Sequence, residues 1–337
     1  MLRGECGRPV IRQPAGRRLV YRFTAENGSG FAANISKQLL GGYMKVKIVF
    51  LLSFFCMAVF QNYGVCSDVP TPEELIDLHL KAIGEPKALS YIKSIGFWGA
   101  SDVEFIQGMR GKMLGTSMLL SQGNKICIAL GFSDTNYEGE YFAYDGKDVT
   151  VKNVGPGVKT PLADFLFTYN KIMKNGMLGG IFSNAWPLLN IKRSKPTYMN
   201  VRSTRLDGKD VYELEYRPKD RHGDMKIRMF FETDTYRHIR TEYKVSLDND
   251  ASHGTRGETN NVWAVSGMVT GSTIFTLTEK FDDFKEIGFL TLPHSYAINY
   301  DLDGIARAAF IGRWNLKVKE IAFNAEKVDP KIFKAEK

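Results

Sequence analysis

The chain has 337 residues, a formal net charge of +8, 44% hydrophobic residues and only four cysteines. This length and apolar content support a large core, and they exclude a disordered chain or a small disulfide-stapled domain. The positive charge is concentrated at one end: residues 1–67 hold nine Lys or Arg and two acids, which leaves +1 for the rest. A nucleic-acid partner is therefore not predicted.

Residues 44–67 have the layout of a secretory signal peptide. Two lysines precede a 13-residue apolar run, Ile48–Phe60, and smaller residues then lead to Cys66. The run is too short to span a membrane, which takes about 20 apolar residues. We therefore expect the chain to be exported. Lipid attachment at Cys66 is the less favoured alternative, because the residues before it do not form a good lipobox.

Residues 1–43 are rich in arginine, poor in acids and without apolar periodicity. Such a segment is not expected to fold. Because a signal peptide begins at Met44, our hypothesis is that translation starts there and that residues 1–43 are an upstream leader. The mature chain, residues 68–337, is then expected to form one domain.

The first element predicted in the mature chain is a helix. Thr71 is a candidate N-cap, a proline follows it, and Glu74 completes a capping box. An apolar face continues to Gly84, which is typical of a helix end. His79 lies beside this face, where we expect a packed or hydrogen-bonded residue. A short second helix is predicted over 86–95.

Strands dominate most of the remaining chain. Runs of strand-forming residues between Gly-containing turns predict strands over 94–107, 112–121, 125–132, 139–144 and 148–153. Asp-Gly pairs at 145–146 and 207–208 predict two hairpins.

Later runs alternate between apolar and polar residues. Met229 and Phe231 share one predicted face, whereas His238 is placed with charged residues on a polar face. Such alternation is typical of an antiparallel sheet with one dry face.

Residues 160–189 interrupt the strand pattern. Apolar residues at spacings of three and four from Leu162 to Met177 predict a helix that ends at Gly179-Gly180, before Phe182 and Trp186. Two interpretations remain open. The helix is the core partner of the sheet, or it encloses with the sheet a cavity for an apolar ligand, with Met and Phe as adaptable lining.

The sequence contains no motif that predicts catalysis. The histidines lack metal-site spacing, and there is no nucleophile elbow, P-loop or dinucleotide fingerprint. Residues 247–261 depart from the EF-hand pattern and are expected to form a solvated loop. Cys127 is expected to be a buried structural thiol. We predict no enzyme, no cofactor and no metal.

Five ordered segments resemble the periplasmic outer-membrane lipoprotein carrier and sorting family. They are "LIDLHLKAIGEPKALSYIKSIGFWG", "EYFAYDGKDV", "RLDGKDVYELEYRP", "FDDFKEIGFLTLPHSYAINY" and "WNLKVKEIAFNAEKVDPKIF". The resemblance implies an α+β fold in which a strongly curved antiparallel β-sheet forms an open half-barrel, with helices covering its concave apolar face. It also implies a non-enzymatic carrier or sorting role, in which the cavity binds a lipid or the acyl chains of a lipoprotein.

On this basis the segment 160–189 is expected to be a lid that hinges at its glycines. The expected ligand-binding residues are Leu162, Phe165, Leu166, Tyr169, Met173, Met177, Phe182 and Trp186. Trp98 on the first strand is a further candidate, for which a core position is favoured. The expected partners are lipid or lipoprotein acyl chains and, as a second candidate, an envelope protein. Peripheral contact with a membrane is compatible with both partners. The chain is expected to be a monomer. The alternative is an envelope sensor or protein-interaction module on the same fold, without a transported ligand.

Overall fold

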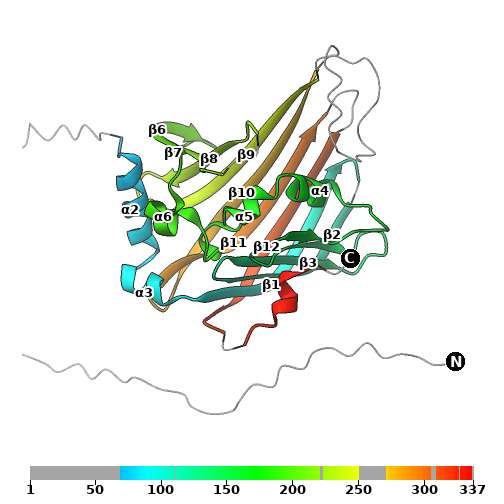
Figure 1. Cartoon of the computed structure of the whole chain (residues 1–337), viewed down its shortest axis with the longest axis horizontal. Coiled ribbons are helices and arrows are strands. Elements are labelled where there is room, and N and C mark those ends of the chain that lie inside the picture. The colour runs from blue at the N-terminus through cyan, green and yellow to red at the C-terminus, as the bar shows by residue number, and fades with distance from the viewer. Residues whose placement is uncertain are drawn as a thin grey trace, which may run out of the picture. The chain divides into compact units, whose positions relative to one another are not determined.

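One antiparallel sheet holds more than half of the residues that the structure describes (Figure 1). The computed structural model describes residues 69–109, 111–220, 223–249, 271–304, 309–325 and 327–335. The predicted leader, the signal peptide, Cys66 and most of the loop 247–261 lie outside these residues.

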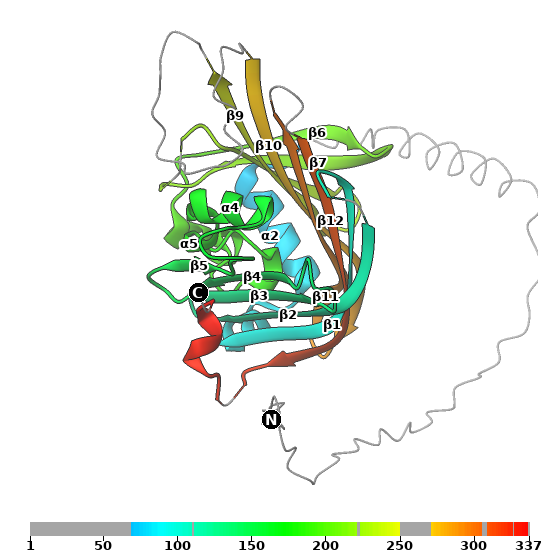
Figure 2. The same cartoon turned by 90° about the vertical axis from the view of Figure 1, so that its right-hand side faces the viewer.

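The sheet contains twelve strands in the order β5-β4-β3-β2-β1-β12-β11-β10-β9-β8-β7-β6. Their bounds are β1 Ser94–Gln107, β2 Gly111–Gln122, β3 Lys125–Phe132, β4 Gly139–Tyr144, β5 Val149–Val151, β6 Tyr198–Leu206, β7 Lys209–Arg217, β8 Lys226–Glu232, β9 His238–Asn249, β10 Gly271–Ile287, β11 Leu290–Asp303 and β12 Ala309–Phe323. The end strands β5 and β6 are not paired with each other, so the sheet is open. Figure 2 shows that it bends strongly between its two ends.

The strands follow the sequence pattern closely. The predicted range 94–107 is β1, and the later ranges 125–132 and 139–144 are β3 and β4. The predicted hairpin between β6 and β7 is also present: Asp207 and Gly208 have φ values of 52° and 85°. Two positive values match the twist of adjacent strands, and the Asp-Gly pair adopts them at little cost.

The helices of the described residues are few and short. They are α2 Pro72–Ile83, α3 Pro86–Tyr91, α4 Pro161–Thr168, α5 Lys171–Lys174 and α6 Ile191–Ser194, with 3₁₀ turns at η2 Gly180–Phe182, η3 Pro187–Asn190 and η5 Pro330–Phe333. The predicted capping box of α2 is confirmed, because Thr71 and Glu74 exchange hydrogen bonds. Among the described residues, no helix has the length and apolar content needed to cross a membrane.

The prediction of one continuous helix from Leu162 to Met177 is wrong. Helix α4 ends at Thr168, and Tyr169 has a non-helical ψ of 44°. The Asn170 side chain turns back and donates a hydrogen bond to the Phe167 carbonyl, at 3.0 Å. Because an asparagine that binds nearby backbone competes with the helix ladder, the chain breaks here and restarts as α5.

The two faces of the sheet differ in what covers them. Phe97 is fully buried, and its ring lies 4.9 Å from that of Phe182. Trp98 is 38% exposed and, as the next residue in the strand, points the other way. We call the face that carries Phe97 the inner face and the face that carries Trp98 the outer face.

The polar position predicted for His238 is wrong. The side chain is 3% exposed, and its Nε2 lies 2.8 Å from the Thr241 hydroxyl. The pairing of β8 with β9 shifts register between Phe230 and Phe231, beside His238. Since a one-residue shift moves a side chain to the other face of a sheet, this irregularity reverses the expected alternation.

Candidate functional site

The residues predicted to bind ligand in segment 160–189 are all buried. Their exposed fractions do not exceed 8% for Leu162, Phe165, Leu166, Tyr169, Met173, Met177, Phe182 and Trp186. They belong to one apolar cluster that also includes inner-face residues of the sheet. Trp98 lies apart from them on the outer face, so the favoured core position of Trp98 is wrong.

Aromatic contacts join the whole length of the segment to the inner face. The Phe165 ring lies 5.2 Å from that of Tyr300, and the Trp186 indole lies 5.2 Å from the His238 ring. With the contact of Phe182 to the sheet, these pairs place the start, middle and end of the segment on one apolar surface. Large rings of this kind contribute most of the apolar area that such a contact buries.

A buried carboxyl on β10 holds the middle of the segment. Glu279 is fully buried and accepts hydrogen bonds from the Gly179 N–H at 2.7 Å, the Tyr243 hydroxyl at 2.8 Å and the Tyr296 hydroxyl at 2.5 Å. Burial raises the pKa of Glu279 to about 7, although the three hydrogen bonds act in the opposite direction. The segment is therefore fixed to the sheet through a titratable group.

The Tyr243 hydroxyl has two acceptors within reach. It lies 2.8 Å from Glu279 and 3.1 Å from the Met177 carbonyl, which belongs to the segment. A phenol has only one proton to donate. When Glu279 is protonated and donates to the phenol oxygen, the phenol proton is free for Met177. Protonation of Glu279 thus allows the Tyr243 hydroxyl to donate to the segment.

A second buried carboxyl holds the start of the segment. Glu140 on β4 is 2% exposed and accepts hydrogen bonds from Thr160 and Tyr137, both at 2.9 Å. Thr160 is the N-cap of α4 and accepts in turn from the Ala163 N–H at 3.0 Å. Burial raises the pKa of Glu140 to about 7 as well.

Glycines fix the shape of the turn between α5 and η2. Gly176 and Gly180 have φ values of 67° and 50°. A Cβ at Gly180 would lie 2.8 Å from the Phe281 ring, and one at Gly176 would lie 2.2 Å from the Ala185 carbonyl oxygen. Both the conformation and the space therefore require glycine. Hinging at these positions stays a prediction.

An aromatic and imidazole cluster surrounds the end of the segment. His79 on α2 lies between Trp186, at 5.3 Å, and Phe231, at 5.0 Å between ring centroids. Its Nδ1 lies 2.8 Å from the Tyr236 carbonyl oxygen, whereas its Nε2 and the Trp186 Nε1 have no hydrogen-bond partner among the residues that the structure describes. Burial lowers the pKa of His79 to about 4, so the imidazole is neutral at pH 7. This is a packed histidine, as expected.

Neither buried carboxyl is among the residues predicted from the sequence, although the sequence contains a signal for both. Glu279 lies two residues from both Leu277 and Phe281, so it shares their face of the strand. An acid on an otherwise apolar face indicates a buried polar group. In the same way, Glu140 shares a face with Phe142. Within the described ranges, no three His, Cys, Asp or Glu residues are placed to hold a metal ion.

Comparison with known proteins gives similarity at the level of structure. No protein-family model matches the chain, and no curated protein sequence matches it. Solved structures do match. A LolA superfamily protein from Nitrosomonas europaea has 15% identity and a TM-score of 0.41, covering 79% of this chain and 98% of its own.

Two further structures match over similar lengths. A DUF1329 family protein from Desulfovibrio piger has 10% identity and a TM-score of 0.40, covering 77% of this chain and 95% of its own. A domain described as an outer membrane lipoprotein-sorting protein domain, from Vibrio parahaemolyticus, has 12% identity and a TM-score of 0.37, covering 76% and 95%. The predicted resemblance is thus also found among solved structures. Similarity at this level transfers neither activity nor ligand to the chain.

Proposed function

We propose that the chain is a non-enzymatic, exported carrier or sorting protein of the periplasm. In this proposal residues 68–337 are one half-barrel domain, and the helices cover its concave inner face. The ligand is a lipid, or the acyl chains of a lipoprotein, and it occupies the inner face in place of segment 160–189. The observation that carries the proposal is the continuous apolar contact between that segment and the inner face.

The segment is suited to be displaced as a unit. It is broken into α4, α5 and η2 rather than being one long helix. Two buried carboxyls attach it to the sheet, Glu140 at Thr160 and Glu279 at Gly179. Further hydrogen bonds join Met177 to Tyr243 and Asn184 to Ser121. The ring contacts of the segment with the sheet are apolar, and an acyl chain offers similar apolar surface.

Burial of an acyl chain is of the same size as the cost of binding it. Covering sixteen methylenes yields about 13 kcal/mol at about 0.8 kcal/mol for each CH₂. Association costs about 4–15 kcal/mol before side chains are ordered. In this proposal the ligand makes the apolar contacts that the lid loses. The free energies of the loaded and the closed states are then similar. A carrier needs that balance, since it must accept its ligand at one membrane and give it up at another.

Hydrogen exchange with mass spectrometry tests the proposal. The full chain is compared with and without 1-palmitoyl lysophospholipid below its micelle concentration. We expect faster exchange in segment 160–189, including the Gly179 amide, while the central strands stay protected. Binding without faster exchange in the segment, or absence of binding, would contradict the carrier proposal.

The packing of the closed state also supports the alternative function. The predicted contact residues of the segment are buried, and both anchoring carboxyls have their hydrogen-bond partners without any ligand. An envelope sensor or interaction module would keep this state permanently. Native mass spectrometry after mild extraction separates the two: co-purified lipid supports the carrier, whereas a lipid-free chain bound to a protein supports the module.

A further inference from the structure

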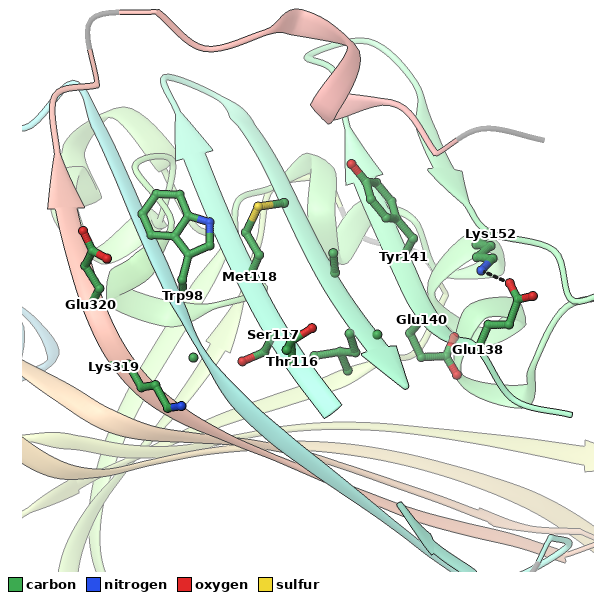
Figure 3. A pocket seen from close by; sticks show the side chains of 14 residues that line it. Trp98, Thr116, Ser117, Met118, Glu138, Glu140, Tyr141, Lys152, Lys319 and Glu320 are labelled. Carbon is green, nitrogen blue, oxygen red and sulfur yellow. Dashed lines mark hydrogen bonds and ion pairs between the residues drawn. The ribbon is translucent and has the colours of Figure 1, made fainter. Parts of the chain in front are cut away.

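A groove of about 640 Å³ lies on the outer face, away from segment 160–189 (Figure 3). One wall is a row of large side chains that crosses the strands: Trp98 pairs with Met118, Met118 with Ala129, and Ala129 with Tyr141. We call Trp98, Met118 and Tyr141 the ridge. The floor beside the ridge is lined by small residues, which include Gly131 and its pairing partner Thr116.

The chain's own C-terminal segment occupies the other side of the same ridge. Val328 and Ile332 pack with Met118 and Tyr141, next to the buried ring of Phe333. The Tyr141 hydroxyl donates a hydrogen bond to the Ile332 carbonyl oxygen at 2.7 Å. This surface therefore already binds one polypeptide segment, through apolar side chains and a main-chain carbonyl.

We propose that the groove binds an apolar peptide segment of a partner protein, lying along the ridge opposite the C-terminal segment. From β12 to β4 the groove crosses four strand spacings of about 4.8 Å, or about 19 Å in all. About six extended residues have that length. Small or aliphatic side chains of the partner would enter the shallow floor at Gly131, and larger ones would pack on Trp98.

The ends of the groove favour a peptide over an acyl chain. Lys319 and Glu320 lie at one end, and Lys152 is paired with Glu138 at 2.6 Å at the other. Charges of both signs suit the polar main chain and flanking residues of a peptide. An acyl chain would instead stay partly exposed to water along an open groove, and each uncovered methylene would lose about 0.8 kcal/mol.

Gly131 provides a way to fill the groove without disturbing the fold. It is exposed, its backbone is not in the left-handed region, and a Cβ there would meet only the Thr116 hydroxyl, at 3.6 Å. Gly131→Leu therefore places a side chain on the floor. Lys112→Leu is the matched control, since Lys112 lies on the same face of neighbouring β2 but does not line the groove. Trp98→Ala removes part of the ridge and serves as a second groove variant.

The probe is a phage library of random linear twelve-residue peptides, selected on the immobilised full chain. We expect the enriched peptides to contain a run of apolar residues. Compared with the native chain, Gly131→Leu and Trp98→Ala should bind the synthetic peptides at least tenfold more weakly, and Lys112→Leu should bind them equally well. No enrichment, or equal binding to all variants, would overturn the proposal. So would lysophospholipid binding that Gly131→Leu abolishes, because the groove would then be a lipid site. The exchange response of segment 160–189 to lysophospholipid reports on the inner face, so the two proposals fail separately.

Discussion

Replacing Glu279 with Gln tests whether the segment is anchored by a titratable group. Glutamine has the same length and can still accept a hydrogen bond from the Gly179 N–H, but it stays neutral at every pH. In the native chain the pKa of Glu279 rises from 4.5 to about 7 on folding. Below pH 4.5 both states are protonated, and the stabilising contribution of Glu279 is fully present. As the pH rises through 7 that contribution is lost, because only the folded state has to ionise a buried acid.

The size of the effect follows from the pKa. A pKa raised from 4.5 to about 7 corresponds to about 3 kcal/mol, at about 1.4 kcal/mol per pH unit. The pH profile of the native chain alone would not show it. Burial lowers the pKa of His79 to about 4, so its contribution is lost as the pH falls through that value and has the opposite slope. The informative quantity is therefore the difference between native chain and variant.

Urea unfolding followed by tryptophan fluorescence, from pH 4.5 to 8.5, measures that difference. We expect the free energy of unfolding of the native chain, relative to Glu279→Gln, to fall by about 3 kcal/mol across this range. Glu286→Gln, at an exposed position on the same strand, should give a flat difference. A flat difference for Glu279→Gln as well would refute the reasoning, since Glu279 would then ionise in the folded chain as it does in water.

Three further predictions concern the segment and the core. Gly180→Ala should destabilise the chain by about 1–3 kcal/mol in urea unfolding, through strain and contact with Phe281, whereas Gly223→Ala, with φ of 57° and open space, should show the strain alone. Phe182→Ala should cost about 3–5 kcal/mol of stability yet tighten binding of lysophospholipid in a fluorescence titration, because it weakens the closed state; weaker binding would mean that Phe182 contacts ligand. Burial raises the pKa of Cys127 to about 11, so mass-spectrometric peptide mapping should find it unlabelled by iodoacetamide at pH 7 until urea is added.

Most of the sheet could be predicted from the sequence because its signals are local. The range of β1 and the Asp207-Gly208 turn follow from strand propensity and from the few residues that accept positive φ. The first helix follows from its capping box. The helix break at Asn170 was missed because apolar spacing continues across it, while the hydrogen bond that ends α4 depends on one side-chain rotamer.

The site was only half predictable for a different reason. Apolar spacing identified the buried residues of segment 160–189, yet it did not distinguish Trp98 from them, because either face of a strand accepts an aromatic residue. The position of His238 depends on a register shift between β8 and β9. Partners far apart in the chain, such as Gly179 and Glu279, are brought together only by the tertiary fold.

The buried carboxyls bear on the choice between a permanent core helix and a displaceable lid. A helix packed permanently on the sheet gains nothing from burying acids, since apolar residues of similar size would avoid the desolvation cost. Here Glu140 and Glu279 each accept a hydrogen bond from the segment, and the pKa of each is raised to about 7. Above that pH, ionisation in a dry site weakens the closed state, while opening of the segment exposes the charge to water. After division by the intrinsic amide rates, we therefore expect hydrogen exchange of segment 160–189 in the native chain to become faster above pH 7. In the double variant Glu140→Gln with Glu279→Gln, this rise in exchange rate should be absent. If the exchange rate of the double variant rises as in the native chain, opening of the segment depends on groups other than these two carboxyls.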